Sequence, residues 1–276
     1  MQRTTQGHSP IFIALLSAVL LLLTSVEVTA KEQTVVRFCT PNADVYPFFI
    51  FTDQGEVTGI NPQILSQVFG HGQLENVAIQ YIMRPWKRCD VELRAGTVDM
   101  IIGSYNEQRD QFGLYPKEID PALENSYFSN VEICLTTLNR PNYIAKAQAG
   151  LRGETKLTVG VEAGFSQSHG ESMVIDWLVI YNYLEKFTLL ERGRVDAISE
   201  VCSIDQTQIK TKADYAGMQD ISTIYEPYVA NQAYVVFSEA FATQHADIAK
   251  TILTQLDNFD KQSIYQFYQQ GKNRAD

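Results

Sequence analysis

The segment Gly164-Phe165-Ser166-Gln167-Ser168 contains the residue types of a hydrolase nucleophile turn, in which a serine stands between two glycines. Such a turn exposes the serine hydroxyl for attack on a carbonyl carbon and needs a histidine and an acid beside it in space. Here Ser168 replaces the second glycine, and His169 follows Ser166 too closely in the sequence to act as its partner. The pattern therefore does not support a serine hydrolase.

The cysteines and histidines are the other groups whose types could do chemistry. The chain has four of each, no pair of cysteines has C-x-x-C spacing, and the histidines are scattered, so we predict no metal site. In an exported protein four cysteines favour two disulfides, for which three pairings are possible, and buried thiols are the alternative. The cysteines are Cys39, Cys89, Cys134 and Cys202.

The N-terminus has the layout of a secretory signal peptide. Arg3 provides a positive start, residues 11–23 are apolar apart from Ser17, and Val28-Thr29-Ala30 resembles a cleavage site. A membrane span needs about 20 apolar residues, so a retained anchor is the less favoured alternative. We predict that residues 1–30 are removed and that the mature chain is exported to the bacterial periplasm.

Composition and charge exclude some classes of partner. The chain has 22 basic and 32 acidic residues, a net charge of -10, and 45% hydrophobic residues. No basic cluster is present, which argues against nucleic acid and against an anionic membrane surface as partners. The composition is that of a globular protein, and the length suits one large or two ordinary domains.

A nine-residue segment occurs twice in the chain. Residues 93–101 (LRAGTVDMI) and 190–198 (LERGRVDAI) are identical at five of nine positions. In each copy an amphipathic helix ends on a glycine, Gly96 or Gly193, which suits the left-handed position after a helix, and a short strand follows. The repeat predicts two similar halves, although a single doubly wound domain with a chance repeat is an alternative.

The elements around the repeat support two halves. A helix is expected from Asn61 as N-cap, with Pro62 at its first position, to Gly70, and another is expected after Asn182 as N-cap. Predicted strands cover 35–39, 77–83, 157–161, 178–181 and 233–238, and further helices cover 86–95 and the apolar positions of 248–256 and 264–268. Each half thus has the order strand, helix, glycine, strand, which is typical of a mostly parallel sheet.

With these elements in place, the mature chain resembles the family 3 extracellular solute-binding proteins, the polar amino-acid receptors of ABC transporters. The resemblance rests on motifs in a fixed order: Tyr46-Pro47-Phe48, Gly59-Ile60-Asn61, residues 84–88, Glu107-Gln108-Arg109, Val159-Gly160-Val161 with Gly164, and residues 193–197. It implies an α/β, two-lobed type II periplasmic-binding fold, in which each lobe is a mostly parallel sheet flanked by helices and the cleft lies between the lobes. Lobe 1 would contain residues 31–128 and 233–276 and lobe 2 residues 129–232, with hinge crossings near 127–130 and 227–233.

The resemblance also implies a set of ligand-binding residues in the cleft. Arg109 stands where the family keeps its carboxylate-binding arginine, and Trp86 stands where it places an aromatic platform. Tyr46 is a candidate aromatic wall of the site. The candidates for polar or backbone contacts are Ser104, Gly164 and Ser166. The alternatives are a surface arginine, a core tryptophan, a rim tyrosine and ordinary serine caps. Asp99 and Asp196 are expected to stabilise turns.

The sequence departs from the family pattern in the second lobe. Where amino-acid receptors of this family usually carry an aspartate for the α-amino group, this chain has Val201, and Glu200 precedes it. A one-residue offset on a strand points a side chain to the other face, so Glu200 is not expected to substitute. A carboxylated ligand without an α-amine therefore suits the sequence as well as an amino acid does.

The implied lobes also select one disulfide pairing. Cys39 and Cys89 fall in lobe 1, whereas Cys134 and Cys202 fall in lobe 2. Because a bridge between lobes would resist closure, we predict Cys39–Cys89 and Cys134–Cys202.

The function that the resemblance implies is capture of a small polar ligand by hinge closure, for an ABC-transporter permease at the inner membrane. We expect a monomer without cofactor and without enzymatic activity. One alternative is a periplasmic sensor subunit that acts on a membrane signalling partner. Another is a dehydratase on the same fold, which would need a cleft carboxylate such as Glu132, Glu162 or Glu200.

Overall fold

The computed structural model describes residues 33–52, 54–163, 173–181, 183–215 and 217–270. From Thr34 onward these residues belong to one unit. The predicted signal peptide lies outside the described residues, and so do Gly164, Ser166 and the predicted helix cap Asn182. Among the described residues, no helix is long and apolar enough to cross a membrane.

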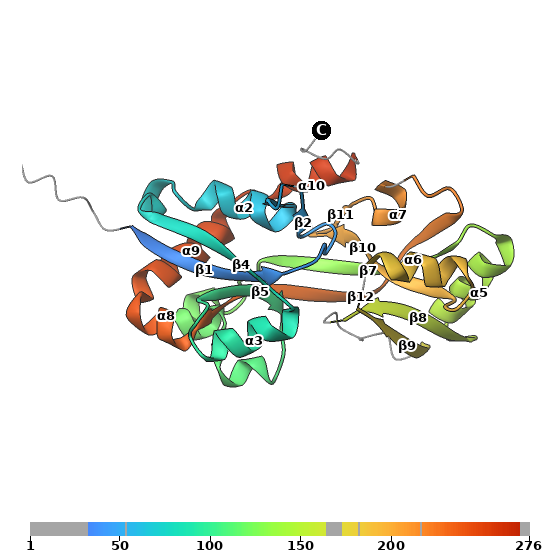
Figure 1. Cartoon of the computed structure of the whole chain (residues 1–276), viewed down its shortest axis with the longest axis horizontal. Coiled ribbons are helices and arrows are strands. Elements are labelled where there is room, and N and C mark those ends of the chain that lie inside the picture. Colours follow the sequence, from blue (N-terminus) through green and yellow to red (C-terminus); the bar gives the residue numbers. More distant parts are fainter. Residues whose placement is uncertain (1–32, 53, 164–172, 182, 216, 271–276) are drawn as a thin grey trace, which may run out of the picture. The chain divides into compact units, whose positions relative to one another are not determined.

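A single sheet with the strand order β4-β1-β5-β12-β7-β10-β8-β9 runs through this unit, with β6 and β11 beside it (Figure 1). Its strands are β1 (Thr34–Pro41), β4 (Val77–Arg84), β5 (Met100–Ser104), β6 (Gly113–Leu114), β7 (Ser129–Leu138), β8 (Lys156–Glu162), β9 (Val174–Ile180), β10 (Ala197–Ile204), β11 (Thr207–Gln208) and β12 (Ile221–Ser238). Strands β4, β1 and β5 are parallel at one end, and β10, β8 and β9 are parallel at the other. The long antiparallel strands β12 and β7 join the two parallel parts.

Helices flank both parts of the sheet. They are α2 (Ile60–Val68), α3 (Trp86–Arg94), α4 (Pro116–Ile119), α5 (Pro141–Leu151), α6 (Tyr183–Glu191), α7 (Lys212–Tyr215), α8 (Glu239–Gln244), α9 (Ala246–Asn258) and α10 (Gln262–Gln269), with 3₁₀ turns at Gly72–Leu74, Arg109–Gln111 and Pro121–Leu123. Helices α2, α3, α8 and α9 lie around β1, β4 and β5, whereas α5, α6 and α7 lie at the other end (Figure 1). A small separate sheet pairs β2 (Ile50–Phe51) with β3 (Val57–Thr58). The architecture confirms the predicted two-lobed α/β class.

Most predicted elements are present, and the glycines of the repeat have the expected conformation, with φ of 66° at Gly96 and 63° at Gly193. The predicted cap Asn61 is wrong. Helix α2 begins at Ile60, Gly59 is its N-cap with φ 113°, and Asn61 is buried in the first turn. A Cβ atom at Gly59 would lie 2.5 Å from the carbonyl oxygen of Phe48, so this close approach requires glycine.

Two predicted boundaries near the C-terminus also differ. The strand expected at 233–238 is only the last part of β12, which has 18 residues. Its first part was missed because exposed residues and a register shift between Ile224 and Val229 interrupt the alternation of apolar side chains. A short helix, α8, precedes the two helices that were expected to end the chain.

The two aspartates of the repeat do the same structural work. The amide of Asp99 donates to the carbonyl oxygen of Arg37 at 2.8 Å, and its carboxylate accepts from the Arg37 amide at 2.7 Å. Asp196 makes the equivalent pair with Thr158, at 2.8 and 2.9 Å. Each aspartate thereby connects the start of the strand that follows it to the first strand of its half. This agrees with the expected stabilising role.

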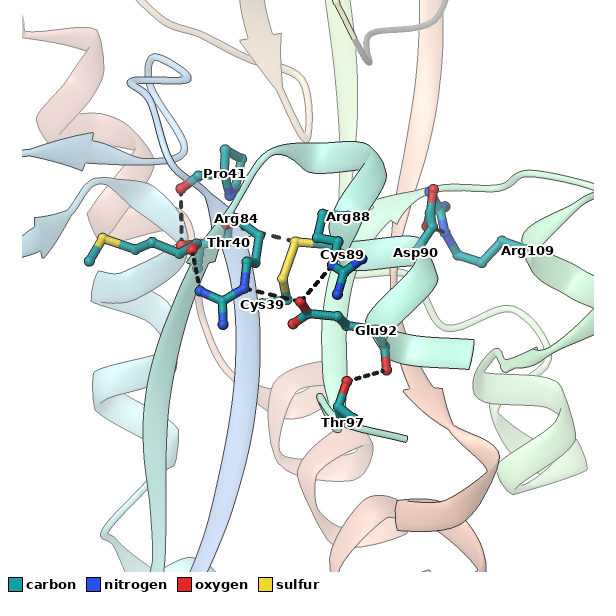
Figure 2. Close-up of a disulfide and its surroundings, with 11 residues drawn as sticks. Cys39, Thr40, Pro41, Arg84, Arg88, Cys89, Asp90, Glu92, Thr97 and Arg109 are labelled. Carbon is teal, nitrogen blue, oxygen red and sulfur yellow. Dashed lines mark hydrogen bonds and ion pairs between the residues drawn. A yellow bond between two sulfur atoms is a disulfide. The ribbon is translucent and has the colours of Figure 1, made fainter. Parts of the chain in front are cut away.

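Both disulfides have the predicted pairing. Cys39–Cys89 joins β1 to α3 (Figure 2), and Cys134–Cys202 joins β7 to β10, each with a Cα–Cα distance of 5.7 Å. The first bridge covalently attaches a helix to the sheet. The second connects two strands that the hydrogen-bond ladder already pairs.

The two predicted hinge segments lie side by side. Ser129 pairs with Ala233 and Asn130 pairs with Gln232 in the ladder between β7 and β12. The amide of Phe128 also donates to the carbonyl oxygen of Ala233 at 2.7 Å. The lobe boundaries at 128/129 and 232/233 stay a prediction, and this geometry supports them.

We predict that Asp99→Ala lowers the free energy of unfolding by about 2–4 kcal/mol, because it leaves the Arg37 amide and guanidinium without their buried acceptor. Asp176→Ala is the matched control, since Asp176 and its partner Lys156 are both more than half exposed. Urea unfolding followed by circular dichroism measures both variants. Equal losses would show that the buried aspartate is not a structural anchor.

Candidate functional site

A cavity of about 540 Å³ is lined by residues from both parts of the sheet and from the helices beside them. The part around β5 contributes Trp86, Ser104 and Arg109, and the part around β10 contributes Glu162, Lys186 and Glu200. This volume is within the usual range of small-molecule sites, about 300–1,000 Å³. The cavity is therefore the candidate binding site.

Arg109 is fixed in the cavity wall by the protein itself. It is only 4% exposed. Its Nε donates to Oδ1 of Asp90 at 2.7 Å, and its Nη1 donates to the carbonyl oxygen of Ser104 at 2.7 Å. The side chains of Asp90 and Arg109 meet to the right of the disulfide in Figure 2. The guanidinium thus has a defined position and orientation before any ligand is bound.

The surroundings of Arg109 keep it charged. Burial lowers the pKa of Arg109, but the hydrogen bond and the charge of Asp90 raise it, and the net result is a pKa above the ordinary value. Trp86 lies beside the guanidinium, with its ring centre 5.7 Å from Cζ of Arg109. A Cβ atom at Gly103 would lie 3.0 Å from the Trp86 ring and 3.3 Å from Nη1 of Arg109, so glycine allows both side chains to pack on β5.

The structure brings four of the six predicted ligand-binding residues to this cavity: Tyr46, Trp86, Ser104 and Arg109. Tyr46 is buried, its ring contacts that of Tyr268, and Nζ of Lys212 lies 5.4 Å from its ring centre, so it forms part of the wall. Ser104 is exposed at the end of β5. Gly164 and Ser166 lie outside the described residues, so their placement at the cavity stays a prediction.

A buried lysine between two glutamates forms the other side of the site. Lys186 on α6 is 2% exposed, and its Nζ lies 2.6 Å from Oε1 of Glu162 and 3.6 Å from Oε1 of Glu200. Our sequence analysis did not identify Lys186. The available signal was a charged residue on a helix face that also carries Leu190, four positions later, which is fully buried.

Glu200, which the sequence did not predict to bind the ligand, lines the cavity. Both Glu200 and Val201 contribute to the lining. The ladder with β7 is regular from Ile198 to Val201, so the side chains of Glu200 and Val201 alternate in direction, and the register shift lies beyond them, between Val201 and Ser203. Of the carboxylates considered for acid–base chemistry, Glu162 and Glu200 line the cavity and Glu132 does not.

The environment of Glu200 favours its neutral form. Burial raises the pKa of Glu200, the charge of Lys186 lowers it, and the charge of Glu162 raises it again. The net shift is upward. Within the described ranges, no group of three or more His, Cys, Asp or Glu side chains is placed to hold a metal ion.

Comparison with known proteins identifies solved structures of the same fold. The substrate-binding protein of an amino acid ABC transporter superposes with a TM-score of 0.59 at 15% identity, over 86% of this chain and 100% of that chain. A P235GK mutant of the arginine-binding protein ArgBP from T. maritima gives 0.61 at 15% identity, over 86% and 96%. The ancestral amino-acid-binding protein AncCDT-1, a precursor of cyclohexadienyl dehydratase, gives 0.59 at 14% identity, over 85% and 95%.

These likenesses show the fold. The chain has the two-lobed α/β architecture of substrate-binding proteins. No family model and no curated protein matches the sequence. Membership of solute-binding family 3 therefore stays a prediction.

We predict that Lys186→Met lowers the free energy of unfolding by about 3–5 kcal/mol, because it leaves the Glu162 carboxylate, whose side chain is only 14% exposed, without its cation. Lys156→Met, which removes one partner of an exposed ion pair, should have little effect. Chemical unfolding at neutral pH provides the comparison. A small loss at Lys186 would mean that the glutamates around it do not depend on its charge.

Proposed function

We propose that this protein is a periplasmic solute-binding protein that captures a small polar, carboxylated ligand in the cavity and delivers it to an ABC-transporter permease at the inner membrane. The observation that carries the proposal is the buried Arg109. Its guanidinium is held by Asp90 and by the Ser104 carbonyl and lies in the cavity wall beside Trp86. A fixed guanidinium recognises a carboxylate by charge-assisted hydrogen bonds without losing much freedom on binding.

The ligand would bridge the two parts of the sheet. Arg109 and Trp86 belong to proposed lobe 1, whereas Glu162, Lys186 and Glu200 belong to proposed lobe 2. A ligand that contacts both groups stabilises the closed form by its differential affinity for that form. The paired segments of β7 and β12 are the hinge in this mechanism, because they are the hydrogen-bonded connection between the two parts.

The ligand's second polar group would meet the Glu162–Lys186–Glu200 cluster. An amino acid and an amino-free carboxylic acid both fit the carboxylate half of the site. They differ in the group that they present to the cluster, an ammonium in one and an uncharged polar group in the other. The similar structures, a substrate-binding protein of an amino acid ABC transporter and ArgBP, support the solute-binding role and leave this choice open.

A dehydratase is a second candidate function because the cavity contains a buried carboxyl with a raised pKa, Glu200, beside Lys186. Such a group can donate a proton to a leaving hydroxyl. Incubation of the protein with hydroxylated carboxylic acids, followed by mass spectrometry for loss of water, tests this candidate. Product formation that Glu200→Gln abolishes would replace the binding-protein proposal.

We predict that the mature chain, from Lys31 onward, is stabilised by a ligand in a thermal-shift screen of amino acids, amino-free carboxylates, polyamines and small peptides. A ligand at 100 times its dissociation constant adds about 2.7 kcal/mol of stability, or about 5–11 °C for a chain of this size. Hits should carry a carboxylate. Stabilisation only by polyamines would contradict the assigned role of Arg109.

We further predict that Arg109→Ala weakens binding of that ligand by about 2–5 kcal/mol, because the ligand carboxylate loses its buried partner. Arg94→Ala is the matched control, since Arg94 stacks on Phe112 and lies outside the cavity lining. Titration calorimetry below the melting temperature of each variant separates affinity from stability. An unchanged dissociation constant for Arg109→Ala would remove this residue from the site.

A further inference from the structure

A continuous chain of threonine hydroxyls connects Glu200 in the cavity wall with Asp214 on α7. Thr136 Oγ1 lies 3.2 Å from Oε2 of Glu200 and 2.9 Å from Oγ1 of Thr223. Thr223 Oγ1 lies 2.9 Å from Oγ1 of Thr211, which lies 2.8 Å from Oδ2 of Asp214. We call these five side chains the hydroxyl chain. It runs from the cavity through β7 and β12 to a partly exposed carboxyl.

The hydroxyl chain is short of one hydrogen when both carboxyl groups are ionised. It has four oxygen–oxygen contacts at hydrogen-bond distance. Each threonine hydroxyl has one hydrogen to donate, so Thr136, Thr223 and Thr211 supply three. One contact would then set lone pairs against lone pairs, although Thr136 and Thr211 are fully buried. All four bonds form together only when a carboxyl at one end carries a proton.

The surroundings assign that proton to Glu200. Asp214 is partly exposed, and the oxygen that contacts Thr211 also accepts a hydrogen bond from the Tyr225 hydroxyl. Glu200 is buried, and Lys186 lies 3.6 Å from it but 2.6 Å from Glu162. The lysine therefore pairs mainly with Glu162.

The charges and hydrogen bonds that act on Glu200 within the described residues have a net effect in the same direction. The charge of Glu162 on β8 and burial both raise the pKa of Glu200. Lys186 on α6, the Thr136 hydroxyl on β7 and the Ala213 amide on α7 lower it, and the net direction is upward. Lys212 lines the same cavity and lies against the Tyr46 ring.

We propose that Glu200 and Asp214 share one proton through the hydroxyl chain, and that Glu200 is a neutral carboxylic acid in the ligand-free cavity. When Glu200 ionises, it gives its hydrogen to Thr136, Thr136 gives its own to Thr223, and Thr223 gives its own to Thr211. Thr211 then gives its hydrogen to Asp214, which becomes neutral. Every oxygen keeps its bonding, and the proton reaches Asp214 without passing through the cavity.

The shared proton specifies the ligand class, and this step rests on the proposed function. On this side of the cavity Lys212 lies against the Tyr46 ring. With Glu200 neutral, the Glu162–Lys186–Glu200 cluster contains an ion pair of zero net charge and an uncharged carboxyl. It suits a hydroxyl, amide or other uncharged polar group. The preferred ligand is thus a carboxylate, held by Arg109, whose far end is uncharged. A ligand ammonium would ionise Glu200 and release a proton through Asp214.

Infrared spectroscopy of the ligand-free mature protein, with labelled glutamate, tests the shared proton directly. We expect a protonated-carboxyl C=O band that persists above the titration of ordinary glutamates and that Glu200→Gln abolishes. Thr223→Val should move the disappearance of this band to lower pH, because a broken chain no longer needs the extra proton. Thr223 reaches Glu200 only through the Thr136 hydroxyl in the hydroxyl chain. Asp214→Asn should move it in the same direction, because its amide can donate to Thr211.

The controls separate the chain from simple burial. Thr223→Ser keeps the hydroxyl and should titrate like the wild type. Thr137→Val removes a buried hydroxyl that donates to the Asp196 carbonyl oxygen outside the chain, and it should also leave the band unchanged. If the band is missing in the wild type, or if Thr223→Val and Thr137→Val titrate alike, the shared proton is overturned.

Proton release on binding tests the ligand class. Calorimetry in buffers of different ionisation enthalpy should show release with carboxylates that carry a far-end ammonium, and none with uncharged analogues. Glu200→Gln should abolish the release. Absence of binding by any carboxylate would refute the proposed function and leave the infrared result standing. Binding of both ligand types without proton release would refute only the shared proton's role in ligand choice.

Discussion

The antiparallel ladder between β7 and β12 is the constraint on which the rest of this structure depends. Each parallel part of the sheet is attached to one edge of this pair, β5 to β12 and β10 to β7. The cavity is lined by residues of both parts, so its shape is set by how the pair runs between them. Any relative movement of the two parts must bend two hydrogen-bonded strands, and β12 has its register irregularity between Ile224 and Val229. A paired connection of this kind favours a small set of arrangements over free rotation.

The polar groups of the cavity are held by the protein before a ligand arrives. Asp90 and the Ser104 carbonyl hold Arg109, Glu162 holds Lys186, and Thr136 contacts Glu200. Preorganisation of this type lowers the entropy that binding must remove. It also places a paired cation at each side of the cavity, Arg109 with Asp90 at one and Lys186 with Glu162 at the other.

The repeated G-x-V-D segments show how a conspicuous sequence feature can belong to the scaffold. Asp99 and Asp196 each fasten a strand to its neighbour through a pair of backbone contacts. The residues of the cavity come from elsewhere, and the two halves contribute different chemistry, an arginine with a tryptophan in one and a lysine with two glutamates in the other. The repeat therefore explains the symmetry of the fold, and the site is built from the differences between the halves.

The sequence alone determined the α/β class, the order of most elements and the left-handed glycines, because hydrophobic periodicity and glycine conformation are local properties. Together with the family resemblance, the sequence also predicted the disulfide pairing that the structure has. It likewise predicted that Arg109, Trp86, Ser104 and Tyr46 lie in one cavity, as they do. Only the tertiary structure placed Lys186 between Glu162 and Glu200, since three elements distant in the sequence meet there. It also placed Glu200 at the cavity and in contact with a chain of hydroxyls, because distances between elements remote in the sequence are not contained in any local pattern.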